Sequence, residues 1–144
     1  MATPVYGKQF IRFAETGLVD EVDAIPQFRV VSINNAPASE PPTIQLTGAE
    51  PFYGVLQQDV DALDPDKATT HQRLGTVATS GLLLVEASAT NPPVQGTALE
   101  VDGNGIAVTA GGGLGTAVVT SGGAAMVRQM VTIGGTYMAL VSFG

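Results

Sequence analysis

The sequence TALEVDGNGIAVT at residues 97–109 carries the clearest structural signal in the chain. Apolar and β-branched residues lie on both sides of Asp102-Gly103-Asn104, a sequence typical of tight turns. Gly103 or Asn104 can adopt the positive φ angle that such a turn needs. The stretch therefore predicts a β-hairpin whose strands are residues 97–101 and 105–109.

Strand signals continue along the rest of the chain, and helix signals are nearly absent. Short segments rich in apolar and β-branched residues alternate with turns rich in Gly or Pro. Ser80-Gly81 is a second tight-turn signal and predicts a hairpin between the strands on either side of it. Only Asp64-Pro65 resembles a helix start, and we expect no more than one helical turn there. The further predicted strands are residues 27–33, 43–47, 52–56, 74–79, 82–87, 115–120, 124–132 and 136–143.

This pattern predicts an all-β fold, a small β-barrel or β-tulip-like domain with an extended N-terminal arm. The chain has 144 residues, which is the usual size of one domain. Residues 1–26 end at a proline and become acidic towards it, so we expect an N-terminal arm or an added strand or hairpin there. Residues 27–144 are the expected β-barrel-like domain, in which residues 34–42 (NNAPASEPP) are a Pro-rich loop.

Composition argues against several classes of function. Six Lys and Arg residues against 13 Asp and Glu residues give a net charge of −7, and the cations are scattered singly, so we expect no nucleic-acid partner. No apolar stretch approaches the roughly 20 residues of a membrane-spanning helix, so we expect no membrane partner. Pro4, Gly7 and Gln9 interrupt any apolar segment of a signal peptide.

Two motifs suggest ligands, and each is incomplete. The GGGLG sequence at residues 111–115 leads into a predicted strand and is followed by no lysine, so it is interpreted as a turn and not as a phosphate loop. The second motif is an aspartate-rich segment. A calcium loop would need a glycine turn and a distal Glu, and this segment has neither, so we interpret it as a solvated acidic loop. That segment contains Asp59, Asp61, Asp64 and Asp66.

Catalytic constellations are also incomplete. His71 could act as a general base with Ser80 and Asp66, but no serine has a G-x-S-x-G setting, and an exposed loop histidine is the simpler interpretation. Glu86 and Glu100 could form a glycosidase pair, yet the chain has no Trp for stacking on sugars. We therefore expect no catalytic residue, no metal site and no cofactor.

Two segments are candidates for protein contacts. Residues 6–13 (YGKQFIRF) hold three of the eight aromatic residues and two of the six cations. They are either the first strand of the barrel or an arm that adds a strand to a partner. Residues 124–131 are apolar on both strand faces, which favours burial in a core or a subunit interface. The candidate partner interface is Tyr6, Lys8, Phe10, Arg12 and Phe13, and the candidate subunit interface is Met126, Arg128 and Met130.

Several motifs between residues 52 and 143 occur in an order that resembles a known family. They are Gly54-Val55-Leu56 before the acidic loop, the segments at residues 75–77 and 80–85, the strand–turn–strand unit at 93–105, and the closing segments at 115–118 and 137–143. Together they resemble the small head-decoration, or cement, proteins of tailed bacteriophages. The matching span covers about two-thirds of the chain and leaves residues 1–50 unmatched.

The resemblance implies a structural role without catalysis. It implies a homotrimer that binds the major capsid protein on the outer surface of an icosahedral head and stabilises the virion, after synthesis in the host cytoplasm. The alternative is a ligand- or glycan-binding β module of a phage fibre or adhesin. The aromatic fraction of 6% favours the decoration protein, because sugar sites rely on aromatic stacking.

Overall fold

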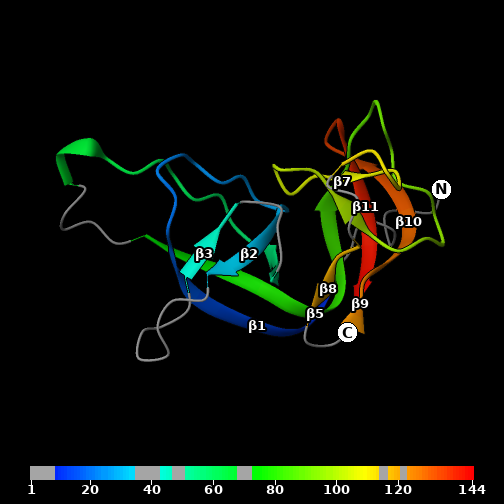
Figure 1. Ribbon diagram of the computed structural model, residues 1–144, viewed down its shortest axis with the longest axis horizontal. Coiled ribbons are helices and arrows are strands. Elements are labelled where there is room, and N and C mark those ends of the chain that lie inside the picture. The colour runs from blue at the N-terminus through cyan, green and yellow to red at the C-terminus, as the bar shows by residue number, and fades with distance from the viewer. Residues whose placement is uncertain (1–8, 35–42, 47–50, 68–72, 114–116, 121–122) are drawn as a thin grey trace.

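The computed structural model of the chain describes residues 9–34, 43–46, 51–67, 73–113, 117–120 and 123–144 (Figure 1). The all-β prediction is confirmed, since the described residues form eleven strands and a single 3-10 turn, η2 (Pro65–Lys67). No helix in these ranges is long and apolar enough to cross a membrane. Tyr6, Lys8, His71 and most of the predicted Pro-rich loop lie outside the described residues.

A seven-stranded sheet dominates the molecule, with strand order β1-β3-β2-β4-β5-β11-β10. Because β1 also pairs with β5, the strands β1, β3, β2, β4 and β5 form a closed series of pairings. Two small sheets, β6-β7 and β8-β9, complete the fold. The strands are β1 (Phe10–Val19), β2 (Val30–Asn34), β3 (Thr43–Gln45), β4 (Phe52–Leu56), β5 (Leu74–Glu86), β6 (Glu100–Val101), β7 (Ala107–Val108), β8 (Val119–Thr120), β9 (Gly123–Ala124), β10 (Met126–Ile133) and β11 (Thr136–Phe143).

The hairpin predicted at Ser80-Gly81 is wrong, because β5 is one continuous strand of 13 residues that runs through this dipeptide. Figure 1 shows β5 in green, running beside β1 and then turning upward towards β11. Gly81 has a φ of 125°, and a Cβ atom there would lie 2.0 Å from the carbonyl oxygen of Phe10. The glycine therefore permits a close approach between two strands, and the chain does not reverse at it.

The hairpin predicted at residues 97–109 is confirmed, but its paired strands, Glu100–Val101 and Ala107–Val108, are shorter than the predicted 97–101 and 105–109. A different glycine from the predicted ones lies in the left-handed region. Asp102 Oδ1 accepts hydrogen bonds from the backbone N–H groups of Asn104, at 2.8 Å, and Ile106, at 3.1 Å. Gly105 has a φ of 71°, whereas Gly103 and Asn104 do not have positive φ angles. A side chain at residue 105 would also collide with the carbonyl oxygen of Val30, 2.3 Å from the position of its Cβ atom.

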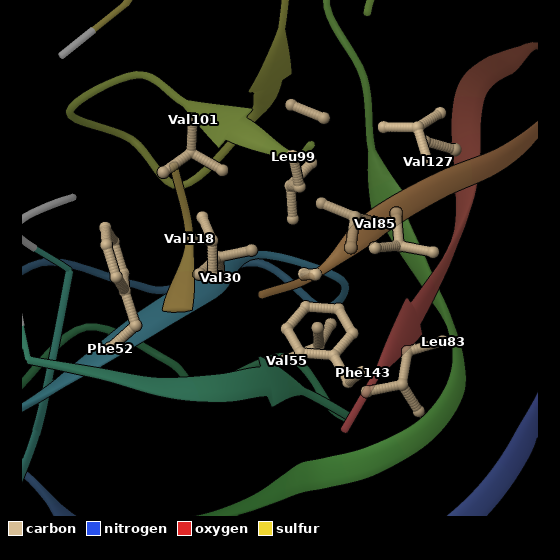
Figure 2. Close-up of a cluster of buried hydrophobic side chains, with 14 of the residues drawn as sticks. Val30, Phe52, Val55, Leu83, Val85, Leu99, Val101, Val118, Val127 and Phe143 are labelled. Atoms are coloured by element: carbon tan, nitrogen blue, oxygen red, sulfur yellow. The ribbon is translucent and has the colours of Figure 1, made fainter. Parts of the chain in front are cut away.

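The central strands bury both of their faces. In β2, Val30 belongs to the main hydrophobic cluster, and the next residue, Val31, belongs to a second cluster. The same alternation holds for Val55 and Leu56 in β4, because successive side chains of a strand point to opposite faces. Figure 2 shows the main cluster, in which Val30, Phe52, Val55, Leu83, Val85, Leu99, Val101, Val118, Val127 and Phe143 are labelled.

The boundary expected after Pro26 does not separate two units of the sheet. Of the two alternatives for residues 1–26, an arm or an added strand, Phe10–Val19 is a strand that pairs with β5 and β3. Ile25 is buried in the second cluster together with Ile44 and Val77. The described residues before Pro26 thus share the sheet and the core of the residues that follow it.

Candidate protein-binding surface

Within the described residues, the strand β1 has a paired neighbour along only one of its edges over most of its length. It pairs with β5 from Phe10 to Leu18. On its other edge, the described residues provide a partner only at Leu18 and Val19, which pair with β3. An unpaired strand edge exposes backbone N–H and C=O groups that can add a further strand. The segment of β1 from Phe10 to Gly17 therefore has the geometry of a strand-addition site.

The open part of β1 also exposes large apolar side chains. Phe10 is 67% exposed and Phe13 is 64% exposed, with Ile11 at 42% beside them. Leu82 on β5, which is the Cα partner of Phe10, is 38% exposed. Single exposed apolar residues are common, but several along one short stretch of strand favour a site of interaction. Successive side chains of a strand point to opposite faces, so Phe10 and Ile11 lie on different faces of β1. We name these four residues together with Arg12 the β1 patch.

Arg12 lies at an irregularity in the middle of the β1 patch. The register between β1 and β5 shifts between Ile11 and Phe13, so Arg12 has no Cα partner in β5. An extra residue of this kind is a β-bulge, and bulges redirect side chains at sheet edges. Arg12 is exposed and makes no hydrogen bond or ion pair with the described residues. Its guanidinium group is thus free to pair with a carboxylate of another molecule.

A hydrogen bond between a tyrosine and a carboxylate restrains β1 at a position that follows the β1 patch in the strand. Tyr53 Oη on β4 donates a hydrogen bond to Glu15 Oε2 on β1. Partial burial raises the pKa of Tyr53 above its ordinary value, and the hydrogen bond and negative charge of Glu15 raise it further. The contact links two strands that both pair with β5, so it restrains the position of β1.

The candidate subunit interface lies at the far end of the strand order, on β10. Met130 packs against the main core cluster, and Met126 is half-buried. Arg128 is exposed, and its Nε donates a hydrogen bond to Ser142 Oγ at 3.0 Å. Val127 is the residue of β10 that is fully buried within this chain. Residues 124–131 are therefore not buried on both faces here, and their role between subunits stays a prediction.

The acidic loop and the strand glutamates have separate structural roles. Asp59 Oδ1 accepts a hydrogen bond from the backbone N–H of Gln27 at 2.8 Å, and Asp64 Oδ1 accepts one from the backbone N–H of Asp66 at 3.0 Å. Glu86 pairs with Arg29 at 3.1 Å, whereas Glu100 accepts a hydrogen bond from the N–H of Gly111. Within the described residues no group of three or more His, Cys, Asp and Glu side chains could hold a metal ion.

The glycine-rich sequence after β7 forms a turn over the part that the structure describes. The N–H of Gly112 donates to the carbonyl oxygen of Thr109 at 2.8 Å, and Gly111 has a φ of 80°. A Cβ atom at Gly113 would lie 2.5 Å from the carbonyl oxygen of Val101. These glycines allow a tight turn and a close backbone contact beside the β6–β7 hairpin.

One feature of the surface was missed at the level of sequence. A cleft of about 520 Å³ lies beside the outer face of β5 and β11, and its lining includes Phe28, Leu84 and Met138. Phe28 has a φ of 66°, an uncommon conformation for a bulky residue, and no sequence pattern predicts it. The lining residues come from segments that are distant in sequence, so their proximity could not be predicted from spacing.

Comparison with protein-family models and with curated proteins finds no match to this chain. Within the described residues, the surface around β1 combines an open strand edge, exposed aromatic side chains and an arginine without a hydrogen bond or ion pair. Features of this kind occur at surfaces that bind proteins by strand addition and aromatic anchors.

Proposed function

We propose that the protein is a structural capsid-decoration protein that binds the outer surface of an icosahedral phage head through the β1 patch, without catalysis. The observation that carries this proposal is the open edge of β1 with Phe10 and Phe13 exposed on it. The order of motifs from Gly54 to the final strand, which resembles that of cement proteins, supports the choice of partner. The major capsid protein is the proposed partner.

The chemistry of the β1 patch suits attachment to a protein surface. Backbone groups along an added strand supply affinity, and the side chains of alternate residues supply specificity. Burying a Phe side chain contributes about 1.5–3 kcal/mol, and anchors of this type dominate interface energies. Arg12 would pair with a carboxylate of the shell, and an exposed ion pair of this kind adds only about 0–1 kcal/mol. The aromatic residues are therefore the main anchors in this proposal.

We also propose that the protein acts as a homotrimer, with Met126, Arg128 and Met130 at the contact between subunits. β10 ends the strand order of the main sheet. Residues 96–98 cover its outer edge at Met126 and Val127, whereas beyond Val127 it pairs only with β11 among the described residues, so a neighbouring subunit would reach it there. Several copies of one weak contact, joined in a trimer, bind a repetitive shell more tightly than one copy does. The trimer and the β1 patch thus have complementary roles in attachment.

The test compares binding of variants to bare icosahedral heads by co-sedimentation. Phe10→Ser/Phe13→Ser should lose most of its attachment, whereas Val22→Ser/Val94→Ser should bind as the unaltered protein does. Val22 and Val94 are 68% and 56% exposed, so the control also removes two exposed apolar side chains. Both variants alter exposed positions, and their melting temperatures should stay close to that of the unaltered protein. Full occupancy by the Phe variant would contradict the proposal.

A further inference from the structure

The cleft beside β5 and β11 has an apolar floor. Phe28, Leu84 and Met138 line it, and these three belong to the same small hydrophobic cluster. Leu84 and Met138 are almost fully buried, whereas Phe28 is half-buried and packs against them. Leu84 and Met138 therefore pack behind the floor, and Phe28, the most exposed of the three, offers apolar surface to a side chain that enters from outside.

Backbone hydrogen bonds hold Phe28 in its unusual conformation. Its N–H donates to the carbonyl oxygen of Leu56 at 2.8 Å, and its carbonyl oxygen accepts from the N–H of Glu86 at 2.9 Å. A positive φ is strained at a bulky residue, so the surrounding hydrogen bonds must hold it in place. The position of this residue in the floor is thus set by β4 and β5 on either side.

Among the described residues, the charged groups that line the cleft are both carboxylates, those of Asp59 and Glu86. Asp59 uses Oδ1 to accept from the N–H of Gln27, and Glu86 uses Oε2 to pair with Arg29. The second oxygen of each carboxylate has no hydrogen bond to the described residues. Arg29 itself is not among the described residues that line the cleft, and besides its pairing with Glu86 its Nη1 donates to the carbonyl oxygen of Asn104.

The amide groups in the lining are largely committed to partners within the chain. Gln9 Nε2 donates to Gln57 Oε1 at 2.7 Å, and Gln9 Oε1 accepts from the N–H of Leu84 at 2.9 Å. Gln27 Nε2 donates to the carbonyl oxygen of Gln57 at 2.9 Å. The charged groups of the described lining that can still form a hydrogen bond are therefore the two carboxylates, which act as acceptors.

We propose that this cleft receives a lysine or arginine side chain of the protein partner. Its aliphatic stem would lie on the floor formed by Phe28, Leu84 and Met138, and its cation would bind the free oxygens of Asp59 and Glu86. Long basic side chains combine an apolar stem with a charged end, and charge-assisted hydrogen bonds to carboxylates are stronger than neutral ones. The inference rests on the proposed function, because it specifies the chemistry of the shell surface that the protein binds.

Methyl and backbone NMR titrations of the full chain test this site with acetyl-Gly-Lys-Gly-amide and acetyl-Gly-Arg-Gly-amide. We expect saturable shifts at Leu84 and Met138 with a Kd on the order of 1–10 mM for one or both peptides. In the control peptides the central residue is norleucine, which keeps the aliphatic stem of lysine, or citrulline, which keeps the length of arginine, and both lack the charge. They should shift these signals little at the same concentration.

Asp59→Asn keeps an acceptor for the N–H of Gln27 and removes the charge, and it should weaken peptide binding ~5-fold or more. Asp64→Asn is the matched control in the same loop, because it also keeps its capping oxygen, and it should bind as the unaltered chain does. Shifts that are absent, equal for the neutral peptides, or undiminished in Asp59→Asn would overturn the proposal.

Lys8 directly precedes Gln9 in the sequence, so Lys8→Gln is titrated in parallel. Binding that occurs only in this variant would mean that a lysine of the chain itself competes for the cleft, which would overturn a role in partner binding. The peptide titrations need no shell and leave the β1 patch unchanged. Their failure is therefore distinguishable from failure of the proposed attachment through Phe10 and Phe13.

Discussion

Replacing Gly81 by alanine should destabilise the protein more than replacing any glycine in an open turn. At this position β5 turns from its pairing with β1 to its pairing with β11. The residue has a φ of 125°, and its missing side chain leaves room for the carbonyl oxygen of Phe10. Alanine meets both obstacles at once, namely an unfavourable backbone conformation and a collision with β1.

The two obstacles can be assigned separate magnitudes. A positive φ costs a non-glycine residue roughly 1–2 kcal/mol. A Cβ atom would lie 2.0 Å from Phe10 O and 2.9 Å from the N of Arg12, so β1 must move and its backbone pairing near Gly81 must weaken. Each lost hydrogen bond costs about 0.5–1.5 kcal/mol. The expected loss is about 3 kcal/mol in the free energy of unfolding, which corresponds to a decrease in Tm of roughly 10 °C.

Two other glycines provide matched controls. Gly96 has a φ of 87°, and nothing lies within 4 Å of the position that a Cβ atom would take, so Gly96→Ala should cost only about 1 kcal/mol of backbone strain. Gly103 has neither a positive φ nor a close neighbour, so Gly103→Ala should be neutral or stabilising by a few tenths of a kcal/mol. Urea unfolding followed by circular dichroism measures all three. Equal losses in the free energy of unfolding for Gly81→Ala and Gly96→Ala would contradict a continuous strand at Gly81. They would instead support the hairpin turn predicted at Ser80-Gly81.

Two further predictions concern the alkaline titration of a tyrosine and the turn of the β6–β7 hairpin. The pKa of Tyr53 lies above the usual value of about 10, so its contribution to stability is complete below pH ~10 and is lost as the pH rises through the folded-state pKa. Glu15→Gln should move the ionisation of Tyr53 to lower pH, seen in ultraviolet absorbance against Tyr53→Phe, and an unchanged titration would contradict the contact. Asp102→Ala should destabilise by about 1–2 kcal/mol in urea unfolding, because two backbone N–H groups lose their acceptor, whereas Asp102→Asn should lose less than half of that.

Local signals in the sequence predicted much of the fold. The strand at residues 52–56 and the final strand at 136–143 have the predicted bounds, because each is an apolar segment between clear turn or breaker residues. The 3-10 turn at Pro65 follows an aspartate that caps it, as the Asp64-Pro65 pair indicated. Each of these features depends on neighbours within a few residues.

Features that depend on distant residues could not be predicted in the same way. The role of Gly81 depends on the carbonyl oxygen of Phe10, which lies 71 residues earlier in the chain, and a Ser-Gly pair is equally typical of a turn. The burial of Val30 and Val31 on opposite faces depends on two separate clusters. Apolar runs show that a segment is buried without showing which strands cover it.

The candidate site stays a prediction, although three of its residues have an exposed position on β1. Phe10, Arg12 and Phe13 stood out because aromatic residues and cations are scarce in this chain, and all three are exposed on β1. The pairing of β1 with β5 was left open between two alternatives, since alternation shows that a segment is a strand and does not identify its neighbour. The acidic cleft was missed because Asp59, Glu86 and Phe28 converge only through the tertiary fold.

The central claim is that the β1 patch attaches the protein to the outside of an icosahedral shell. Electron cryo-microscopy of bare heads incubated with the protein tests it most directly. The account predicts density for the protein on the outer surface, with Phe10 and Phe13 against the shell and the open edge of β1 next to a capsid segment. Heads that stay bare at saturating protein concentration, or bound protein whose β1 patch faces solvent, would contradict it.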